Sequence, residues 1–170
     1  AVRFNLKGDE IETFATLINP GRPVGESVNI HGITDLELVS APDESTALVS
    51  FLNFVDQFTS ANRKPSYIVA HNAKFDKSFF VDAVSRYMSN PKASPFVCTM
   101  LMARRHVNFG ASKRLGDLAA RYRIETGKSH RALDDARTAM KLFMTFAKQR
   151  MEIRPGIRTL AELVGPGEWV

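Results

Sequence analysis

The hydrophobic and polar positions at the start of the chain predict a hairpin followed by a loop. Val2, Phe4 and Leu6 alternate with polar residues and lead into a Lys-Gly-Asp turn. This pattern predicts a β-hairpin whose second strand covers residues 10–18. Prolines and glycine then interrupt the pattern, so residues 19–33 are expected to form a loop.

The rest of the chain alternates short apolar runs with segments of helical period. Apolar residues at helical spacing predict helices over residues 43–60, 115–122 and 133–147. Residues 67–70 and 96–98 are short apolar runs that each lead into a helical segment, as buried strands of α/β proteins do. Strands that alternate with helices indicate an α/β domain.

Composition narrows the class of protein without identifying a function. The chain has 170 residues, of which 44% are hydrophobic and 24% charged, so one globular domain is expected. Cys98 is the only cysteine, which excludes an internal disulfide and a cysteine-rich zinc site. No apolar run approaches membrane-spanning length and no secretory signal opens the chain, so a cytoplasmic protein without a membrane partner is expected. The formal net charge of +5 is compatible with a polyanionic partner.

The first candidate site follows the apolar run at residues 67–70. Residues 71–76 read His-Asn-Ala-Lys-Phe-Asp, which places Asp76 in the first turn of the helix that follows the strand. The carboxyl end of a strand that opens into a helix is where α/β folds place ligands. The ordinary alternative is that Asp76 complements the helix dipole and Asn72 caps the helix.

The second candidate site lies at the start of the last long helix, where residues 130–136 read His-Arg-Ala-Leu-Asp-Asp-Ala. Asp135 shares its side of the helix with apolar positions, namely Ala139, Leu142 and Phe146. An unpaired carboxylate beside an apolar surface is costly to desolvate, whereas a metal ion would compensate its charge. Asp134 points about 100° away and has the more ordinary role of a solvated or capping acid. His130 is either an exposed loop residue or a general base.

Taken together, the two sites resemble the DEDDh branch of the DnaQ-like 3′→5′ exonucleases, which includes the proofreading epsilon subunits of bacterial DNA polymerase III. The family pattern has His-Asn-x-x-Phe-Asp after a strand and His-x-Ala-x-x-Asp at a late helix, and this sequence matches each fixed position. Weaker matches occur at residues 19–21, 30–34 and 115–122. The resemblance covers roughly residues 1–148. It implies a ribonuclease-H-like mixed sheet flanked by helices, with an exonuclease domain over residues 1–150 and a C-terminal extension over residues 151–170.

The resemblance also implies roles for individual residues. Asp76 and Asp135 would be metal ligands, and His130 would be the general base. Two Mg²⁺ or Mn²⁺ ions about 4 Å apart would act on an in-line displacement at the terminal phosphodiester. The remaining implied residues would bind the substrate: Ile30, His31, Asn72 and Phe75. For His31 the ordinary alternative is a loop residue that only satisfies the backbone of a turn.

The family's first motif, Asp-x-Glu on the first strand, is absent from the sequence. Residues 10–13 read Glu-Ile-Glu-Thr, but a turn precedes them where an apolar strand is required, so they are assigned to the hairpin. The sheet is therefore expected to lack the family's first central strand. A longer parent chain, a partner or a rearranged segment would fill the gap, and the chain alone is expected to be nearly inactive.

Nucleic acid 3′ ends, above all those of single-stranded DNA, are the expected partner, and a DNA polymerase subunit is a further one. Eight arginines and lysines lie between residues 104 and 131, where some could hold a phosphate backbone and most are expected to form a solvated surface. Two alternatives to a proofreading exonuclease stay open. One is a non-catalytic nucleic-acid-binding or polymerase-docking module, and the other is a stand-alone exonuclease acting on RNA or oligonucleotides.

Overall fold

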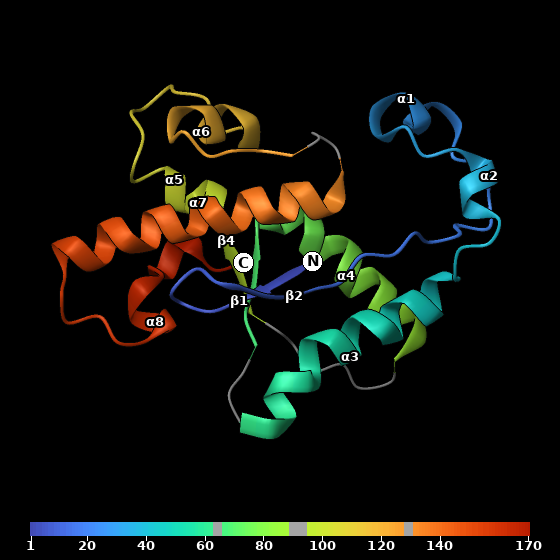
Figure 1. Ribbon diagram of the computed structural model, residues 1–170, viewed down its shortest axis with the longest axis horizontal. Helices are drawn as coiled ribbons and strands as arrows, with labels where there is room; N and C mark the ends of the chain where they lie inside the picture. The colour runs from blue at the N-terminus through green and yellow to red at the C-terminus, as the bar shows by residue number, and fades with distance from the viewer. Residues whose placement is uncertain (63–65, 89–94, 128–130) are drawn as a thin grey trace.

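A computed structural model describes residues 1–62, 66–88, 95–127 and 131–170 of the chain. Figure 1 shows short strands in the middle of the molecule, with the long helix α7 (Ala132–Ile153) on one side and α3 (Glu44–Asn62) on the other. Helix α7 contacts both of the strands that lie nearest to it, β1 and β3. The α/β class predicted from the alternation of strands and helices is therefore confirmed.

The predicted hairpin forms, with a shorter second strand than expected. Strand β1 (Val2–Phe4) pairs antiparallel with β2 (Glu10–Thr13). Beyond Thr13, the Phe14 amide donates to the Ala1 carbonyl at 2.9 Å. The extension of β2 to residue 18 is wrong, since the strand ends at Thr13 and residues 14–18 form no strand.

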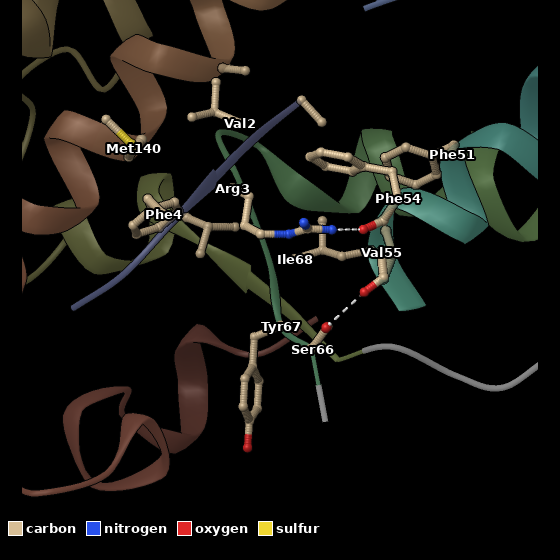
Figure 2. A pocket seen from close by; sticks show the side chains of 13 residues that line it. Val2, Arg3, Phe4, Phe51, Phe54, Val55, Ser66, Tyr67, Ile68 and Met140 are labelled. Carbon is tan, nitrogen blue, oxygen red and sulfur yellow. Dashed lines mark hydrogen bonds between the residues drawn. The ribbon is translucent and has the colours of Figure 1, made fainter. Parts of the chain in front are cut away.

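The second pair of strands is parallel. Strand β3 (Ile68–Ala70) pairs with β4 (Phe96–Cys98), and Val69 lies opposite Val97 in the register. Within the described residues the two pairs of strands are not hydrogen-bonded to each other. Residues of β1 and β3 together line two adjoining hollows of about 140 Å³ and 450 Å³, here called the β1–β3 groove. Figure 2 shows the smaller of the two.

The helices follow the predicted periodicity closely. Helix α3 begins where the Asp43 carboxylate accepts a hydrogen bond from the Thr46 amide at 2.8 Å. Strand β3 leads into α4 (Ala73–Tyr87), and β4 leads into α5 (Thr99–Ala103). The short α6 (Leu115–Arg121) precedes α7. Within the described residues, no helix is long and apolar enough to span a bilayer.

The region expected to be a loop, residues 19–33, contains the 3-10 helix η1 (Gly25–Ser27) and the helix α1 (Val28–His31). Helix α2 (Asp35–Leu38) follows directly and begins with a capping box made by Thr34 and Glu37. Helices of one turn have no periodicity to detect, so only the capping box left a signal in the sequence.

The main core is built on the apolar face of α7. It joins that face to β4, α5 and α6, and its most deeply buried side chains are Val97, Met102, Leu118, Leu142, Phe143 and Phe146. Helix α4 packs on α3, β3 and β4. These contacts hold the first turns of α4 and α7 near the strand β3.

The C-terminal segment packs against the core, to which it contributes the buried Leu163 and Val164. It contains α8 (Leu160–Leu163) and the 3-10 helix η2 (Pro166–Glu168). Trp169 then forms an antiparallel bridge with Val97 of β4, and the Val170 amide donates to the Phe96 carbonyl at 3.0 Å. The division of the chain at residue 150 stays a prediction.

Candidate active site

The carboxyl end of β3 is fixed by the half-buried ring of His71. Its Nδ1 lies 2.9 Å from the Thr99 hydroxyl, and its Nε2 lies 2.8 Å from the Lys113 carbonyl oxygen. Burial lowers the pKa of His71, which favours the neutral ring. In that form Nε2 donates to Lys113 and Nδ1 accepts from Thr99. His71 therefore ties the end of β3 to the start of α5 and to the segment before α6.

Asn72 makes the turn from β3 into α4 with a left-handed backbone, at φ 60° and ψ 44°. Asparagine tolerates this conformation better than most side chains. Its carbonyl accepts the first hydrogen bond of the helix, from the Phe75 amide at 2.8 Å, but its side chain makes no capping bond. The alternative in which the Asn72 side chain caps the helix is therefore wrong.

Asp76 lies in the first turn of α4, as predicted. Although the residue is exposed overall, desolvation by the surrounding protein raises the pKa of its carboxyl group and outweighs a hydrogen bond from its own backbone amide. A helix start should by itself favour the ionised form. A carboxylate that is partly desolvated and yet sits at such a position is suited to a cation as its partner.

Asp134 and Asp135 occupy the first turn of α7. Asp135 is half-buried, on the same side of the helix as the buried Ala139, which agrees with the helical arrangement expected from the sequence. Asp134 lies 3.8 Å from Arg137, three residues further along the helix. Both acids are thus half-buried, and the different roles expected for them stay predictions.

A hollow of about 330 Å³, the Asp135 hollow, opens beside the first turn of α7. It is lined by Arg114, Leu115, Gly116, Thr126, Gly127, Asp134, Asp135 and Thr138. The backbone at Gly127 approaches Asp134 so closely that a β-carbon there would lie 2.3 to 2.6 Å from the carboxylate atoms. Arg114, one of the eight basic residues noted between positions 104 and 131, lines this hollow together with the two acids.

The two helix starts adjoin the same strand. Ala136, one residue after Asp135, lines a hollow together with Ile68 and Val69 of β3. Asp76 lies in the helix into which β3 leads. The fold thus brings the first turns of α4 and α7, each with its predicted carboxylate, to the region around β3 (Figure 1).

Two of the predicted substrate-binding residues, Ile30 and His31, lie on α1, away from this strand (Figure 1). Ile30 is 67% exposed on α1, which stands at the edge of the molecule in Figure 1. The His31 ring accepts a hydrogen bond from the Ile33 amide at 3.0 Å, so it does satisfy the backbone of a turn. Phe75 is 61% exposed, with its ring centroid 4.9 Å from that of Phe79. His130 lies outside the described residues.

The donor set of the two carboxylates matches a hard divalent cation. Carboxylate oxygens are the protein ligands that magnesium and manganese prefer. Among the described residues, however, no group of three or more histidine, cysteine, aspartate or glutamate side chains gathers closely enough to hold a metal ion. The assignment of Asp76 and Asp135 as metal ligands therefore stays a prediction.

The fold has a counterpart among solved structures. Over 93% of this chain and 84% of the other, it matches Exonuclease X in complex with 5′ overhanging duplex DNA, with a TM-score of 0.58 and 22% sequence identity. At that level of identity the likeness establishes the fold, a ribonuclease-H-like α/β architecture of the exonuclease type.

The family follows from the sequence match. The model of the RNase T exonuclease family matches residues 1–143, and the chain belongs to that family. The resemblance to DnaQ-like exonucleases is thereby confirmed.

Two curated relatives show the range of proteins that contain such a segment. One is a DNA polymerase III of the PolC type from Streptococcus pyogenes, 31% identical over 159 residues that cover 93% of this chain. The other is a putative bifunctional exonuclease/endonuclease protein from Mycobacterium tuberculosis, 32% identical over 92% of this chain. The chain spans only 10% and 23% of the length of these relatives.

Proposed function

We propose that the chain forms the catalytic part of a 3′→5′ exonuclease that removes nucleoside 5′-monophosphates from the 3′ ends of DNA. The observation that carries this proposal is the placement of Asp76 and Asp135 in the first turns of two helices that adjoin the strand β3. Membership of an exonuclease family supports the reaction class. DNA is favoured over RNA because the polymerase relative and the Exonuclease X complex are both named for DNA.

Proofreading is the proposed setting of this activity. The segment similar to this chain occupies a small part of a polymerase in the Streptococcus relative. A 3′ end that leaves a polymerase site as single-stranded DNA would then be the substrate, and a polymerase would be the partner. Activity on matched DNA and RNA ends separates this proposal from a stand-alone RNA or oligonucleotide exonuclease.

Asp76 and Asp135 would hold Mg²⁺ or Mn²⁺ through their carboxylates. When bound, such ions lower the pKa of a water molecule and neutralise charge that develops on the phosphate. We assign the proton from the attacking water to His130, on the basis of its place in the family pattern. The water oxygen would bond to phosphorus as the P–O3′ bond breaks. The leaving O3′ would take up a proton from solvent and become the 3′ hydroxyl of the shortened strand, and the terminal nucleotide would leave as a 5′-monophosphate. Arg114, beside the Asp135 hollow, is placed to hold a phosphate oxygen.

The test is a cleavage assay on 5′-labelled single-stranded DNA, with the longest natural polypeptide that contains this chain. We expect stepwise shortening from the 3′ end, nucleoside 5′-monophosphate as the product, and dependence on added Mg²⁺ or Mn²⁺. Cleavage at internal positions, or full activity with a chelator in excess, would exclude the proposal.

Three variants separate the assigned roles. Asp76→Asn and Asp135→Asn should weaken Mn²⁺ binding as well as the rate. His130→Ala should lower the rate by roughly 10²–10⁴-fold and leave Mn²⁺ binding almost unchanged. Asp82→Asn is the matched control, because Asp82 lies on the same helix as Asp76 but is paired with Arg86. A His130→Ala enzyme with a near-normal rate at neutral pH would end the general-base assignment.

A non-catalytic nucleic-acid-binding module is the second candidate. The observation in its favour is that the described residues gather no group of three or more potential metal ligands. For the same reason we expect the 170-residue chain alone to turn over slowly. DNA binding by the longer polypeptide without metal-dependent turnover would favour the binding module.

A further inference from the structure

A fully exposed phenylalanine, Phe109, stands in the connection between α5 and α6. It belongs to a β-turn of residues 108–111, here called the Phe109 turn, in which the Ala111 amide donates to the Asn108 carbonyl at 3.1 Å. Gly110 follows with φ at 85°, in the left-handed region that glycine adopts readily and that this kind of turn requires. Figure 1 shows the connection at the edge of the molecule. The turn therefore presents an aromatic ring to solvent.

The chain is anchored on both sides of the Phe109 turn. Before the turn, the His106 ring stacks on Phe146 of α7, with the ring centroids 4.6 Å apart. After the turn, the Lys113 carbonyl oxygen lies 2.8 Å from Nε2 of His71, at the end of β3. With both ends held by the core, the exposure of the ring in the turn is a fixed property of the fold.

The segment that contains the Phe109 turn carries the net charge of the molecule. Residues 99–123 include six arginines and lysines and one acid, Asp117, so their balance of +5 equals the formal net charge of the whole chain. The positive and negative charges of the other residues cancel. The Lys113 ammonium donates to the carbonyl of Ala111, the last residue of the turn, at 3.1 Å. An exposed aromatic ring and a cation thus lie on one turn, within the basic segment.

The same segment leads from the Phe109 turn to the Asp135 hollow. Arg114, which lines the hollow, comes five residues after Phe109 in the sequence. Five residues of extended chain span at most about 18 Å. A stacked nucleic acid strand rises about 3.4 Å per nucleotide, so a strand whose 3′ end lies in the hollow would reach the turn within roughly five nucleotides.

We propose that the Phe109 turn binds single-stranded DNA on the 5′ side of the terminal nucleotide, with one base stacked on the Phe109 ring and a phosphate held by Lys113. Charge complementarity selects this partner, because a DNA strand supplies a negative phosphate with each base and every base has a face that can stack on an aromatic ring. The ammonium of Lys113 has three donors, so its bond to Ala111 leaves others for a phosphate oxygen. The distance of the turn from the 3′ end rests on the proposed function, whereas the binding itself does not.

The test measures the affinity of the longest natural polypeptide that contains this chain for labelled single-stranded DNA, in excess chelator so that no cleavage occurs. Phe109→Ala should weaken binding by roughly 5- to 150-fold, the usual loss for one stacked base. Phe109→Trp should keep the affinity, whereas Phe109→Leu, which is apolar but has no aromatic face, should lose it as alanine does. Ile153→Ala, at an exposed apolar position on α7, is the matched control and should bind normally. Full affinity in Phe109→Ala or in Phe109→Leu would overturn the stacking contact.

Salt dependence separates the ring from the cation. Lys113→Gln should reduce the slope of log affinity against log salt concentration by about 0.7, the value for one phosphate contact to a single strand. Phe109→Ala should lower the affinity and leave this slope unchanged. An unchanged slope in Lys113→Gln would overturn the phosphate contact.

A photochemical crosslink locates the contact along the strand. Oligonucleotides carry 5-iodouracil at one position each, counted from the 3′ end, and mass spectrometry identifies the peptide that is linked after irradiation. We expect the peptide with Phe109 to be linked from one position within roughly the last five nucleotides. Equal linkage from every position would overturn a fixed contact.

The outcomes also separate this inference from the proposed exonuclease activity. Binding that depends on Phe109, without metal-dependent cleavage, would support the inference and exclude the activity. Cleavage of DNA by a polypeptide whose affinity is the same with Phe109→Ala would do the reverse. Loss of a bound protein subunit from Phe109→Ala at unchanged DNA affinity would overturn the inference and assign the ring to a protein interface.

Discussion

The two outer edges of the β3–β4 strand pair have different neighbours. The outer edge of β4 is covered by the C-terminal segment, through the bridge between Val97 and Trp169. The edge of β3 faces the β1–β3 groove. The side chains of β4 are buried, and its cover includes a buried ion pair, whereas the side chains of β3 are half-buried. An edge in the middle of a fold is thus stable only when something pairs with it.

The C-terminal segment that covers the edge of β4, here called the C-terminal cover, is held in place by a buried carboxylate. Glu168 is 1% exposed, and its carboxylate accepts hydrogen bonds from Arg150, at 2.5 Å for one of the two, and from the Gly165 amide at 2.7 Å. Burial alone raises the pKa of Glu168, but the hydrogen bonds from Arg150 and Gly165 and the nearby positive charges outweigh it. The pKa therefore lies below its ordinary value. At the groove edge, Arg3 of β1 pairs with the more exposed Glu12 and donates a hydrogen bond to the Phe54 carbonyl of α3 (Figure 2).

The largest expected effect comes from breaking this ion pair. Glu168→Ala leaves the Arg150 guanidinium buried without its partner, and we expect a loss of about 3–5 kcal/mol in the free energy of unfolding. Urea denaturation followed by circular dichroism measures it. Glu152→Ala, an exposed position on the same helix as Arg150, is the control and should change stability by less than about 0.5 kcal/mol. A loss below about 1 kcal/mol for Glu168→Ala would contradict the cover as a structural element.

A matched pair of valines compares the two edges directly. Val97 and Val69 are opposite each other in the register, but Val97 is 0% exposed and Val69 borders the groove. Val97→Ala should cost about 2 kcal/mol, whereas Val69→Ala should cost about 1 kcal/mol or less, because the groove already lacks neighbours to lose. Equal losses in thermal unfolding would show that the groove edge is packed as well as the covered one.

The two edges meet at Tyr67 and Trp169, whose ring centroids lie 5.6 Å apart. Tyr67 lines the groove, and Trp169 belongs to the C-terminal cover. A double-mutant cycle with Tyr67→Leu and Trp169→Leu should give a coupling energy of about 0.5–1.5 kcal/mol. Strictly additive losses would show that the cover and the groove are independent.

The last test concerns the sign of a pH effect. Since the pKa of Glu168 is lowered in the folded chain, its stabilising contribution is complete above its unfolded pKa of about 4.3 and is lost as the pH falls through the folded value. The raised pKa of Asp76 acts in the opposite sense: its contribution is complete at low pH and is lost as the pH rises through the folded value. The free energy of unfolding is measured between pH 3 and 7 for the unsubstituted chain, for Glu168→Gln and for Asp76→Asn. The loss of stability caused by each substitution is then plotted against pH. The two plots should have slopes of opposite sign.

Much of the fold could be predicted because its elements carry their own local signals. The period of apolar residues identified α3 and α7, and two apolar runs identified β3 and β4. The C-terminal cover could not be found in this way. It depends on Glu168 meeting Arg150, eighteen positions away, and on a strand bridge that lies outside any regular pattern.

The candidate site was predictable to a similar extent. Spacing alone placed Asp76 and Asp135 in the first turns of their helices. The bonds of His71 to Thr99 and Lys113 join residues 28 and 42 positions apart, and no short motif contains all three. Ile30 and His31 belong to a one-turn helix at the periphery, whose position in the fold depends on contacts that leave no periodic signal.

The single cysteine gives this fold an internal reporter. Cys98 is 2% exposed at the end of β4, opposite Ala70 of β3. A thiol reacts with a disulfide reagent as the thiolate, and a buried one must first reach solvent. Because the sequence has no other thiol, the rate of colour release from such a reagent reads the opening of the parallel strand pair alone. The rate at which this strand pair opens can therefore be measured in the unmodified chain, without a label or a substitution.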